Sequence, residues 1–269
     1  MRFVYDHDLH IHTNISPCAS DPEQTPSRLL KYAEDNGLRT ICVTDHYWDE
    51  TVGSGASLQW YLRQDTAKIK EALPLPKKDG IRFMFGAECE MDTGSRIGVG
   101  REMAEELEFI IVPINHLHLT SITSRGDETP RERAEMLVHR FDALLDSGLP
   151  MKKVGLAHFT DGLVYTAGTS YDVLSLIPES EYRRLFGLAA KAGMGIELNM
   201  PASKPGFGWY NDSFELGIYM IAREMGCKFY FGSDAHTVKG LLAAKEKAER
   251  TIDLLHLTED DKFELARAV

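Results

Sequence analysis

Short apolar runs alternate with segments of helical periodicity along almost the whole chain. The apolar runs predict seven buried strands, at residues 1–5, 40–44, 81–85, 109–114, 153–157, 195–198 and 228–231. Apolar residues spaced three and four apart predict helices at residues 27–36, 58–73, 130–146, 179–192, 213–225, 238–255 and 258–268. Thr25-Pro26 and Gly37 are typical of the two ends of the first helix.

Strands that alternate with helices indicate a parallel sheet. Polar residues that can bind metal follow nearly every predicted strand, so they would meet at the C-terminal face of a closed barrel. An open doubly wound sheet would instead place its site in a single crevice. We therefore predict an α/β fold, a distorted (β/α)7, TIM-like barrel, in one domain spanning residues 1–269.

The polar residues at the strand ends form a candidate metal site. His10 and His12 are two residues apart in an extended segment, so their side chains point to one side of it. One such pair is weak evidence, and a strand-end aspartate can simply cap a turn. However, seven of the ten histidines lie at predicted strand ends, together with three carboxylates. The candidate ligands, which suit Zn, Mn or Fe, are His10, His12, Asp45, His46, Glu88, His116, His158, Asp234 and His236, with His118 close by.

Composition narrows the class of protein. The net charge is −11 without any basic run, which disfavours binding to duplex nucleic acid. Four scattered cysteines without a CxxC pair argue against a disulfide framework and favour a reducing cytoplasm. We expect no membrane span and no signal peptide, because no apolar stretch approaches about 20 residues.

The strand-end residues, taken in chain order, resemble the motifs of the PHP (polymerase and histidinol phosphatase) superfamily. The matching segments are His10-Ile11-His12, Thr44-Asp45-His46, Gly86-Ala87-Glu88, Asn115-His116, Ala157-His158 and Ser233-Asp234-Ala235-His236. The resemblance spans nearly the whole chain and implies a seven-stranded barrel with two or three divalent metal ions.

The resemblance also implies a set of ligands for each metal. One metal would be held by His10, His12, Glu88 and Asp234. Glu88 would bridge to a second metal, held also by His116 and His158. A third would be held by His46 and His236.

This chain departs from the family pattern at Cys18. In trinuclear members a histidine stands six residues after the second histidine of the first motif, and here that position is Cys18. Cys18 either supplies a thiolate ligand or does not bind, which leaves the third site weak, completed by water or empty. Asp21 is a further candidate from the same loop. His118 competes with His116 for one position, and the motif alignment favours His116.

The implied activity is hydrolysis of small-molecule phosphate monoesters. Clustered divalent cations lower the pKa of a bound water and so supply hydroxide as the nucleophile, with Glu88 as the bridging ligand. Asp234 or His236 would assist proton transfer to the leaving oxygen. Histidinol phosphate is the leading named substrate, followed by a nucleotide or another sugar phosphate.

Two further classes remain open. One is a nuclease or protein-tyrosine phosphatase of the same fold, and the other is a non-catalytic metal-binding module. Substrate contacts are expected from the strand-to-helix loops. Arg96 and Arg101 could clamp a phosphate, while Lys204 and Trp209 belong to a loop with several aromatic residues.

Overall fold

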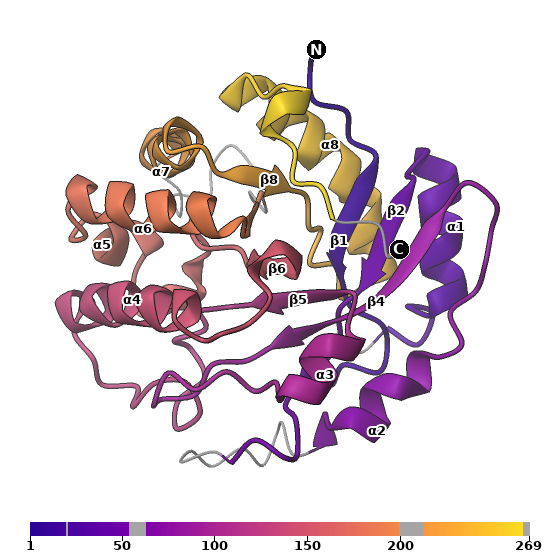
Figure 1. Cartoon of the computed structure of the whole chain (residues 1–269), viewed down its shortest axis with the longest axis horizontal. Helices are drawn as coiled ribbons and strands as arrows, with labels where there is room; N and C mark the ends of the chain where they lie inside the picture. Colours follow the sequence, from indigo (N-terminus) through magenta and orange to yellow (C-terminus); the bar gives the residue numbers. More distant parts are fainter. Residues whose placement is uncertain (20, 54–62, 199–211, 266–269) are drawn as a thin grey trace.

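The computed structural model describes residues 1–19, 21–53, 63–198 and 212–265, and its parallel strands form a nearly closed barrel (Figure 1). Seven strands follow the order β1-β2-β4-β5-β6-β7-β8, and the two-residue strand β3 pairs beside them with β4. Their bounds are β1 His7–Ile11, β2 Thr40–Val43, β3 His46–Tyr47, β4 Arg82–Cys89, β5 Phe109–Val112, β6 Val154–Leu156, β7 Gly195–Glu197 and β8 Lys228–Tyr230.

Hydrogen bonds close the barrel between β1 and the segment that follows β8. Leu9 N donates to Phe231 O at 2.8 Å, and Asp234 N donates to His10 O at 2.8 Å. These bonds saturate what would otherwise be two open edges of the sheet. The predicted seven-stranded TIM-like barrel is therefore confirmed.

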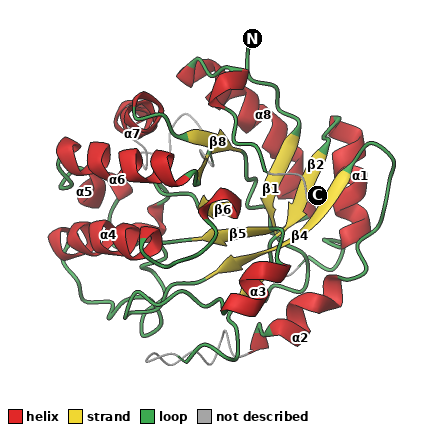
Figure 2. Ribbon diagram, in the orientation of Figure 1, coloured by secondary structure: helices red, strands yellow, loops and turns green. Residues whose placement is uncertain are grey.

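The helices lie around the outside of the strands (Figure 2). They are α1 Pro26–Asn36, α2 Thr66–Ile69, α3 Arg101–Glu106, α4 Pro130–Leu145, α5 Ser170–Leu174, α6 Glu179–Ala192, α7 Asp212–Glu224 and α8 Val238–Leu255. At the start of α1, the Thr25 side chain accepts a hydrogen bond from Arg28 N, and Gly37 ends the helix with φ of 70°. None of the described helices combines the length and apolar composition needed to cross a membrane.

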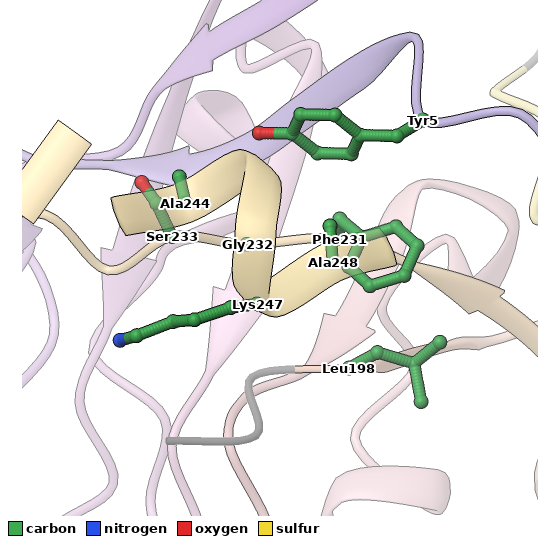
Figure 3. A pocket seen from close by; sticks show the side chains of 8 residues that line it. All are labelled: Tyr5, Leu198, Phe231, Gly232, Ser233, Ala244, Lys247 and Ala248. Atoms are coloured by element: carbon green, nitrogen blue, oxygen red, sulfur yellow. The ribbon is translucent and has the colours of Figure 1, made fainter. Parts of the chain in front are cut away.

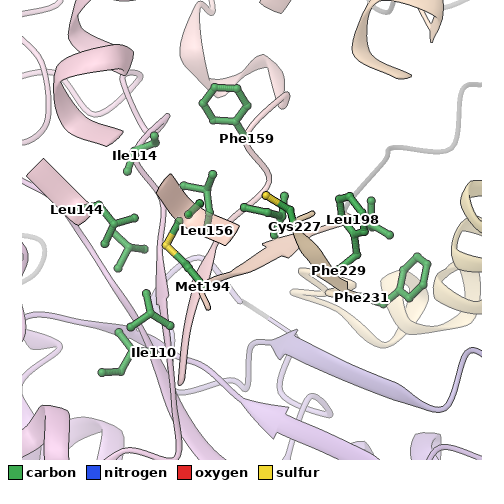
Figure 4. Packing of buried hydrophobic residues seen from close by; sticks show 14 of the residues in the cluster. Ile110, Ile114, Leu144, Leu156, Phe159, Met194, Leu198, Cys227, Phe229 and Phe231 are labelled. Carbon is green, nitrogen blue, oxygen red and sulfur yellow. The ribbon is translucent and has the colours of Figure 1, made fainter. Parts of the chain in front are cut away.

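Apolar residues fill the space between the strands and the helices. Figure 4 shows part of this core, where Ile110, Leu156 and Phe229 from three strands pack with Leu144 of α4. A second cluster lies inside the sheet and includes Leu9, Met84, Phe109, Tyr230 and Phe263. The N-terminal end of the barrel is thus filled with apolar side chains, which leaves the C-terminal end for polar groups.

Two predicted helices are only partly helical over the described residues. In the predicted helix at residues 258–268, Glu259–Asp261 form a 3₁₀ turn and residues 262–265 are not helical. Phe263 N donates to Phe229 O at 2.7 Å, and its ring packs against Phe109 and Tyr230. Burial of this aromatic ring in the barrel stabilises the observed conformation more than a helix with the predicted periodicity would. In the predicted helix at residues 58–73, only α2 and a 3₁₀ turn at Lys70–Ala72 are helical, and residues 58–62 lie outside the described part of the chain.

The first strand also begins later than predicted. Residues 1–6 are largely irregular, and β1 starts at His7, so the His10–His12 pair belongs to the strand end itself. Two short helices, α3 and α5, were not anticipated from the pattern of apolar residues.

Candidate metal centre

The strand ends converge on Glu88, near the end of β4. Its buried Oε2 atom lies 2.9 Å from Nδ1 of His46, 3.4 Å from Nε2 of His12 and 3.6 Å from Nε2 of His10. Among the described residues, this oxygen has no hydrogen-bond partner of good geometry. A buried carboxylate oxygen that faces three imidazole nitrogens without a regular hydrogen bond is the arrangement expected around a cation.

The other oxygen of Glu88 faces two more histidines. Oε1 lies 3.3 Å from Nε2 of His158, which follows β6, and 3.8 Å from Nε2 of His116, which follows β5. The two imidazole rings stack with centroids 4.8 Å apart. Glu88 therefore faces different histidines with each oxygen, as a carboxylate that bridges two metal ions must.

His10, His12 and Asp234 form a compact group of donors. The two Nε2 atoms are 3.1 Å apart, and Asp234 Oδ1 lies 3.4 Å from His10 Nε2 and 3.1 Å from His12 Nε2. Two nitrogens that bind one zinc ion at about 2.0–2.1 Å are separated by about 3 Å. The spacing of this group therefore fits a divalent cation.

Three groups of described residues have ligand atoms within 4.8 Å of one another: His10, His12 and Asp234; His10, Glu88 and His158; and His12, His46 and His236. The first group contains three of the four residues of the first implied ligand set, without Glu88, and the third group contains His46 and His236 of the third implied set together with His12. The second contains His10 in place of His116, whose Nε2 atom lies 3.8 Å from Glu88 Oε1.

Four histidines have their Nδ1 atoms held by fixed partners, which directs Nε2 into the centre. The pairs are His10 with Glu197 (3.1 Å), His12 with Ser16 (3.1 Å), His116 with Glu90 (2.8 Å) and His158 with Asn115 (3.1 Å).

The reasoning from the sequence missed both carboxylates in these pairs. A charged residue inside the apolar run 195–198 was the available signal for Glu197, which is fully buried. Glu90 follows Glu88 by two residues and so shares its side of the strand. The buried guanidinium of Arg140 lies 4.0 Å from Glu90.

Asp45 was predicted to bind metal, but its contacts in the structure indicate a different role. Both of its carboxylate oxygens accept hydrogen bonds, Oδ1 from Thr13 N (2.8 Å) and Ser16 Oγ (2.6 Å), and Oδ2 from Thr13 Oγ1 (2.7 Å). Asp45 is also absent from the three groups of close donors. We therefore correct its assignment from a metal ligand to an anchor of the loop that follows β1.

Cys18 lies at the edge of the centre, on the same loop. The side chains of His236 and His46 interact electrostatically with its thiol. The surrounding protein by itself would raise the pKa of the Cys18 thiol, but these two histidines lower it to about 7. Asp21 instead caps α8, since its Oδ2 accepts from Val238 N at 3.0 Å.

The remaining predicted contacts lie outside the donor groups. His118 packs edge-on against His116, and burial together with that neighbour lowers the pKa of His118 to about 4. Arg101 has a side chain 93% exposed and pairs with Glu105, while Arg96 donates to Gly53 O. Lys204 and Trp209 lie outside the described residues.

Charge balance shapes the centre. Burial alone would lower the pKa of His10, but the carboxylates of Glu197, Asp234 and Glu88 raise it well above its ordinary value. Burial would likewise raise the pKa of Glu88, but His46 and His10 lower it well below the usual range. The buried carboxylates are therefore stabilised by positive charge beside them, which protons on the histidines or bound metal ions can supply.

Two of the candidate ligands also have unusual backbone geometry. His158 has φ of 21° and Asp234 has φ of 50°, values that residues other than glycine seldom adopt. Such a conformation costs about 1–3 kcal/mol and is typical of functional sites. The surrounding hydrogen bonds, including Asp234 N to His10 O, hold Asp234 in this conformation.

A small cavity lies behind the strand end that carries Asp234. It measures about 10 Å³, roughly the space of one water molecule. Figure 3 shows that Lys247 extends from α8 along one side of it, next to Gly232 and Ser233. This cavity is too small for a phosphate ester, so the substrate would have to meet the centre from the open end of the barrel.

A seven-stranded α/β barrel with a histidine- and carboxylate-rich centre at the C-terminal ends of its strands defines a TIM-like fold with a candidate metal centre. The family model of the PHP domain matches this sequence over residues 8–267. The chain therefore belongs to the PHP family of phosphoesterases, whose members use divalent metal ions.

Solved structures agree with this fold. Histidinol phosphate phosphatase from Lactococcus lactis, complexed with zinc, L-histidinol and phosphate, is 16% identical with a TM-score of 0.59, covering 96% of this chain and 98% of its own. A Listeria monocytogenes protein assigned as a histidinol phosphatase is 14% identical with a TM-score of 0.61, covering 87% and 96%. No protein with a curated description matches the chain in sequence.

Proposed function

We propose that the protein hydrolyses small-molecule phosphate monoesters with a cluster of divalent metal ions. One observation carries the proposal: a single buried carboxylate, Glu88, faces the imidazole nitrogens of five histidines. This arrangement has little value for stability without cations, because it gathers many polar groups away from water. It suits a centre that holds two or three ions close together.

Metal ions at this centre would supply an activated water as nucleophile and positive charge beside the phosphoryl oxygens. His10, His12, Glu88 and Asp234 would hold one ion, and Glu88, His116 and His158 another. Glu197, Glu90 and the other Nδ1 partners keep the histidine rings in position.

The leaving oxygen needs a proton at the rim of the centre. Asp234 and His236 are the most exposed members, with side chains 24% and 28% exposed. The Nδ1–H of His236 donates to Asp234 O at 2.8 Å, which leaves its Nε2 atom for a substrate or a metal ion. His236 could therefore transfer a proton to the leaving alkoxide. Burial alone would raise the pKa of Asp234, but His10 and His12 lower it well below its usual range, so Asp234 would carry no proton to transfer.

A small phosphate ester is the substrate class that the charge supports best. The net charge of −11 disfavours a polyanionic nucleic acid, and a phosphate monoester offers the oxygens that clustered cations bind. Histidinol phosphate is the leading specific candidate, because a structurally similar enzyme carries that activity in its name. Nucleotides and sugar phosphates follow.

A panel of phosphate esters tests the proposal. Protein loaded with Zn²⁺, Mn²⁺ or Fe²⁺ would be assayed on histidinol phosphate, nucleoside monophosphates, sugar phosphates, a phosphotyrosine peptide and single-stranded DNA. We expect turnover of at least one small monoester, and a loss of at least about 10³-fold in kcat/KM for Glu88→Ala. Glu71→Ala, at an exposed residue paired with Lys68, is the matched control.

Failure of every metal to support turnover on the whole panel would contradict the enzymatic proposal. If the protein nevertheless bound metal tightly, it would be a non-catalytic metal-binding module. Turnover confined to the peptide or to DNA would replace the small-molecule assignment with the phosphatase or nuclease alternative.

A further inference from the structure

A buried arginine of α4, Arg140, links the two loops that follow β4 and β5. Its Nη2 atom donates to Met91 O at 2.7 Å, and its Nη1 atom donates to Asp92 O at 3.2 Å and to Thr123 O at 3.0 Å. Met91 and Asp92 lie just after β4, and Thr123 lies between β5 and α4. One guanidinium therefore fixes backbone carbonyl groups of both loops.

The same guanidinium faces Glu90, the carboxylate behind His116. Arg140 Nη2 lies 4.0 Å from Glu90 Oε1, and Glu90 Oε2 lies 2.8 Å from His116 Nδ1. The two groups thus meet different oxygens of one buried carboxylate. The other ring nitrogen of His116, Nε2, lies 3.8 Å from Glu88 Oε1. A row of contacts therefore runs from α4 to the carboxylate in the middle of the candidate metal centre.

Arg140 is also connected to the backbone of His116. The side-chain hydroxyl of Thr123 donates to His116 O, and the carbonyl oxygen of the same threonine accepts from Arg140. Arg140 is thus one residue away from both the imidazole and the main chain of this candidate ligand. Displacement of the guanidinium would disturb both.

Arg140 is not placed as a residue that serves stability alone would be. Burial of a guanidinium is costly, and apolar side chains often replace buried ion pairs without loss of stability. In the described part of the chain its Nε atom has no hydrogen-bond partner, and 4.0 Å is too long for a hydrogen bond to Glu90. Burial lowers the pKa of Arg140 to about 10, so it stays charged at neutral pH. Its short contacts are those to loop carbonyls beside the metal centre.

We propose that Arg140 is a positioning residue of the metal centre. It holds Glu90 and the loop after β5 so that the Nε2 atom of His116 is directed at one of the metal ions. The proposal rests on the proposed function only in that the centre binds divalent cations. It gives α4, which supplies no candidate ligand, a share in the affinity of one metal site.

Metal affinity measured site by site tests the proposal. Titration of the metal-free, full-length protein with Zn²⁺ against a chelating dye gives the affinity of each metal equivalent, and His116→Ala identifies the equivalent that depends on His116. Arg140→Met should weaken this equivalent by at least about tenfold. The equivalents that His116→Ala leaves unchanged should keep their affinity in Arg140→Met, whereas a general loss of stability would weaken all of them.

A double-variant cycle shows whether Arg140 acts through Glu90. If it does, the loss of affinity in the variant that combines Arg140→Met with Glu90→Ala should be smaller than the product of the two single losses, by at least about threefold. Arg140→Lys keeps the charge without the planar fork that reaches both loops, so we expect an intermediate loss. The lysine variant replaces Arg140→Met in the cycle if circular dichroism shows that the methionine variant does not fold.

Arg133 provides the matched control, because it is a second buried arginine about two turns earlier on α4. It donates to Leu117 O at 3.0 Å and to Val164 O at 2.8 Å, and it pairs with Glu128 at 3.2 Å. Arg133→Met removes a buried guanidinium from the same helix. Its effect on metal affinity should therefore simply multiply with that of Glu90→Ala.

The positioning role is overturned if the folded Arg140 variant binds every equivalent as tightly as wild type, if all equivalents weaken alike, or if the losses from Arg140→Met and Glu90→Ala multiply. Turnover is not part of these measurements. A protein that binds metal but hydrolyses no phosphate ester can still show the coupling, and an active phosphatase can still lack it. Absence of metal binding would overturn both proposals.

Discussion

Nδ1 of His10 lies 3.1 Å from both carboxylate oxygens of Glu197, a buried pair that joins β1 to β7 across the barrel. Glu197 Oε2 also accepts a hydrogen bond from His158 N at 2.9 Å. One carboxylate therefore positions a ring of one candidate ligand and the backbone of another. A carboxylate behind a metal-binding histidine fixes the tautomer and makes the imidazole a better ligand.

Glu197→Ala should weaken metal binding without removing any ligand. Loss of this orienting carboxylate is expected to lower the affinity for the tightest-bound metal by about 10–100-fold, measured by competition with a chelating dye. Glu197→Gln keeps one acceptor oxygen for His10 Nδ1–H and should have a smaller effect. Equal affinities in wild type and Glu197→Ala would refute the positioning role.

Gly232 makes room for the same pair. A methyl group at this position would collide with the carboxylate of Glu197 and with Cβ of His10. Gly232→Ala should therefore lower the free energy of unfolding by about 1–3 kcal/mol and weaken metal binding, as followed by urea denaturation and dye competition. Gly217→Ala is the control, because a methyl group there meets no atom within 4 Å. Normal metal affinity in Gly232→Ala would show that the pair tolerates displacement.

Asp45→Ala should destabilise the fold rather than empty a metal site. The change removes the acceptor of three hydrogen bonds from Thr13 and Ser16 in a buried setting. We expect a loss of about 2–4 kcal/mol in the free energy of unfolding of the metal-free protein. The number of metal equivalents bound at saturation should not change. A variant that keeps its stability and loses one metal equivalent would restore Asp45 as a ligand.

His7 should make the stability of the metal-free protein depend on pH. Burial lowers the pKa of His7, with Asp6 opposing the effect, and its Nε2 atom accepts a hydrogen bond from Phe231 N at 3.0 Å. The unfolded chain therefore binds the proton more readily than the folded protein. Stability is complete above the unfolded pKa of about 6.5 and declines as the pH falls towards the folded pKa.

A comparison of two variants separates the contribution of His7 to the pH dependence of stability from that of the other histidines. Between about pH 6.5 and 5, the free energy of unfolding of His7→Gln should vary less with pH than that of wild type, by up to about 1.4 kcal/mol per pH unit. His139→Gln, at an exposed residue of α4, should follow wild type. The same pH dependence in all three proteins would rule out the contribution of His7.

The barrel and most of the residues of its centre could be predicted from local patterns in the sequence. Alternating apolar runs and helical segments specify a parallel barrel, and a ligand placed after a parallel strand must lie at the C-terminal face wherever that strand sits. For this reason His10, His12, Glu88, His158, Asp234 and His236 could be brought together before any distance was known.

The contacts of each polar group follow from the folded arrangement of the whole chain. Asp45 follows a strand like the other candidates, but the loop after β1 folds back onto it and occupies both oxygens. Glu197 contacts His10 although the two are 187 positions apart in the sequence. Phe263 lies in a segment of helical periodicity, yet its side chain packs inside the barrel. These contacts depend on which side chains meet when the sheet closes into a barrel. Closure involves residues far apart in the sequence, so local periodicity does not predict these contacts.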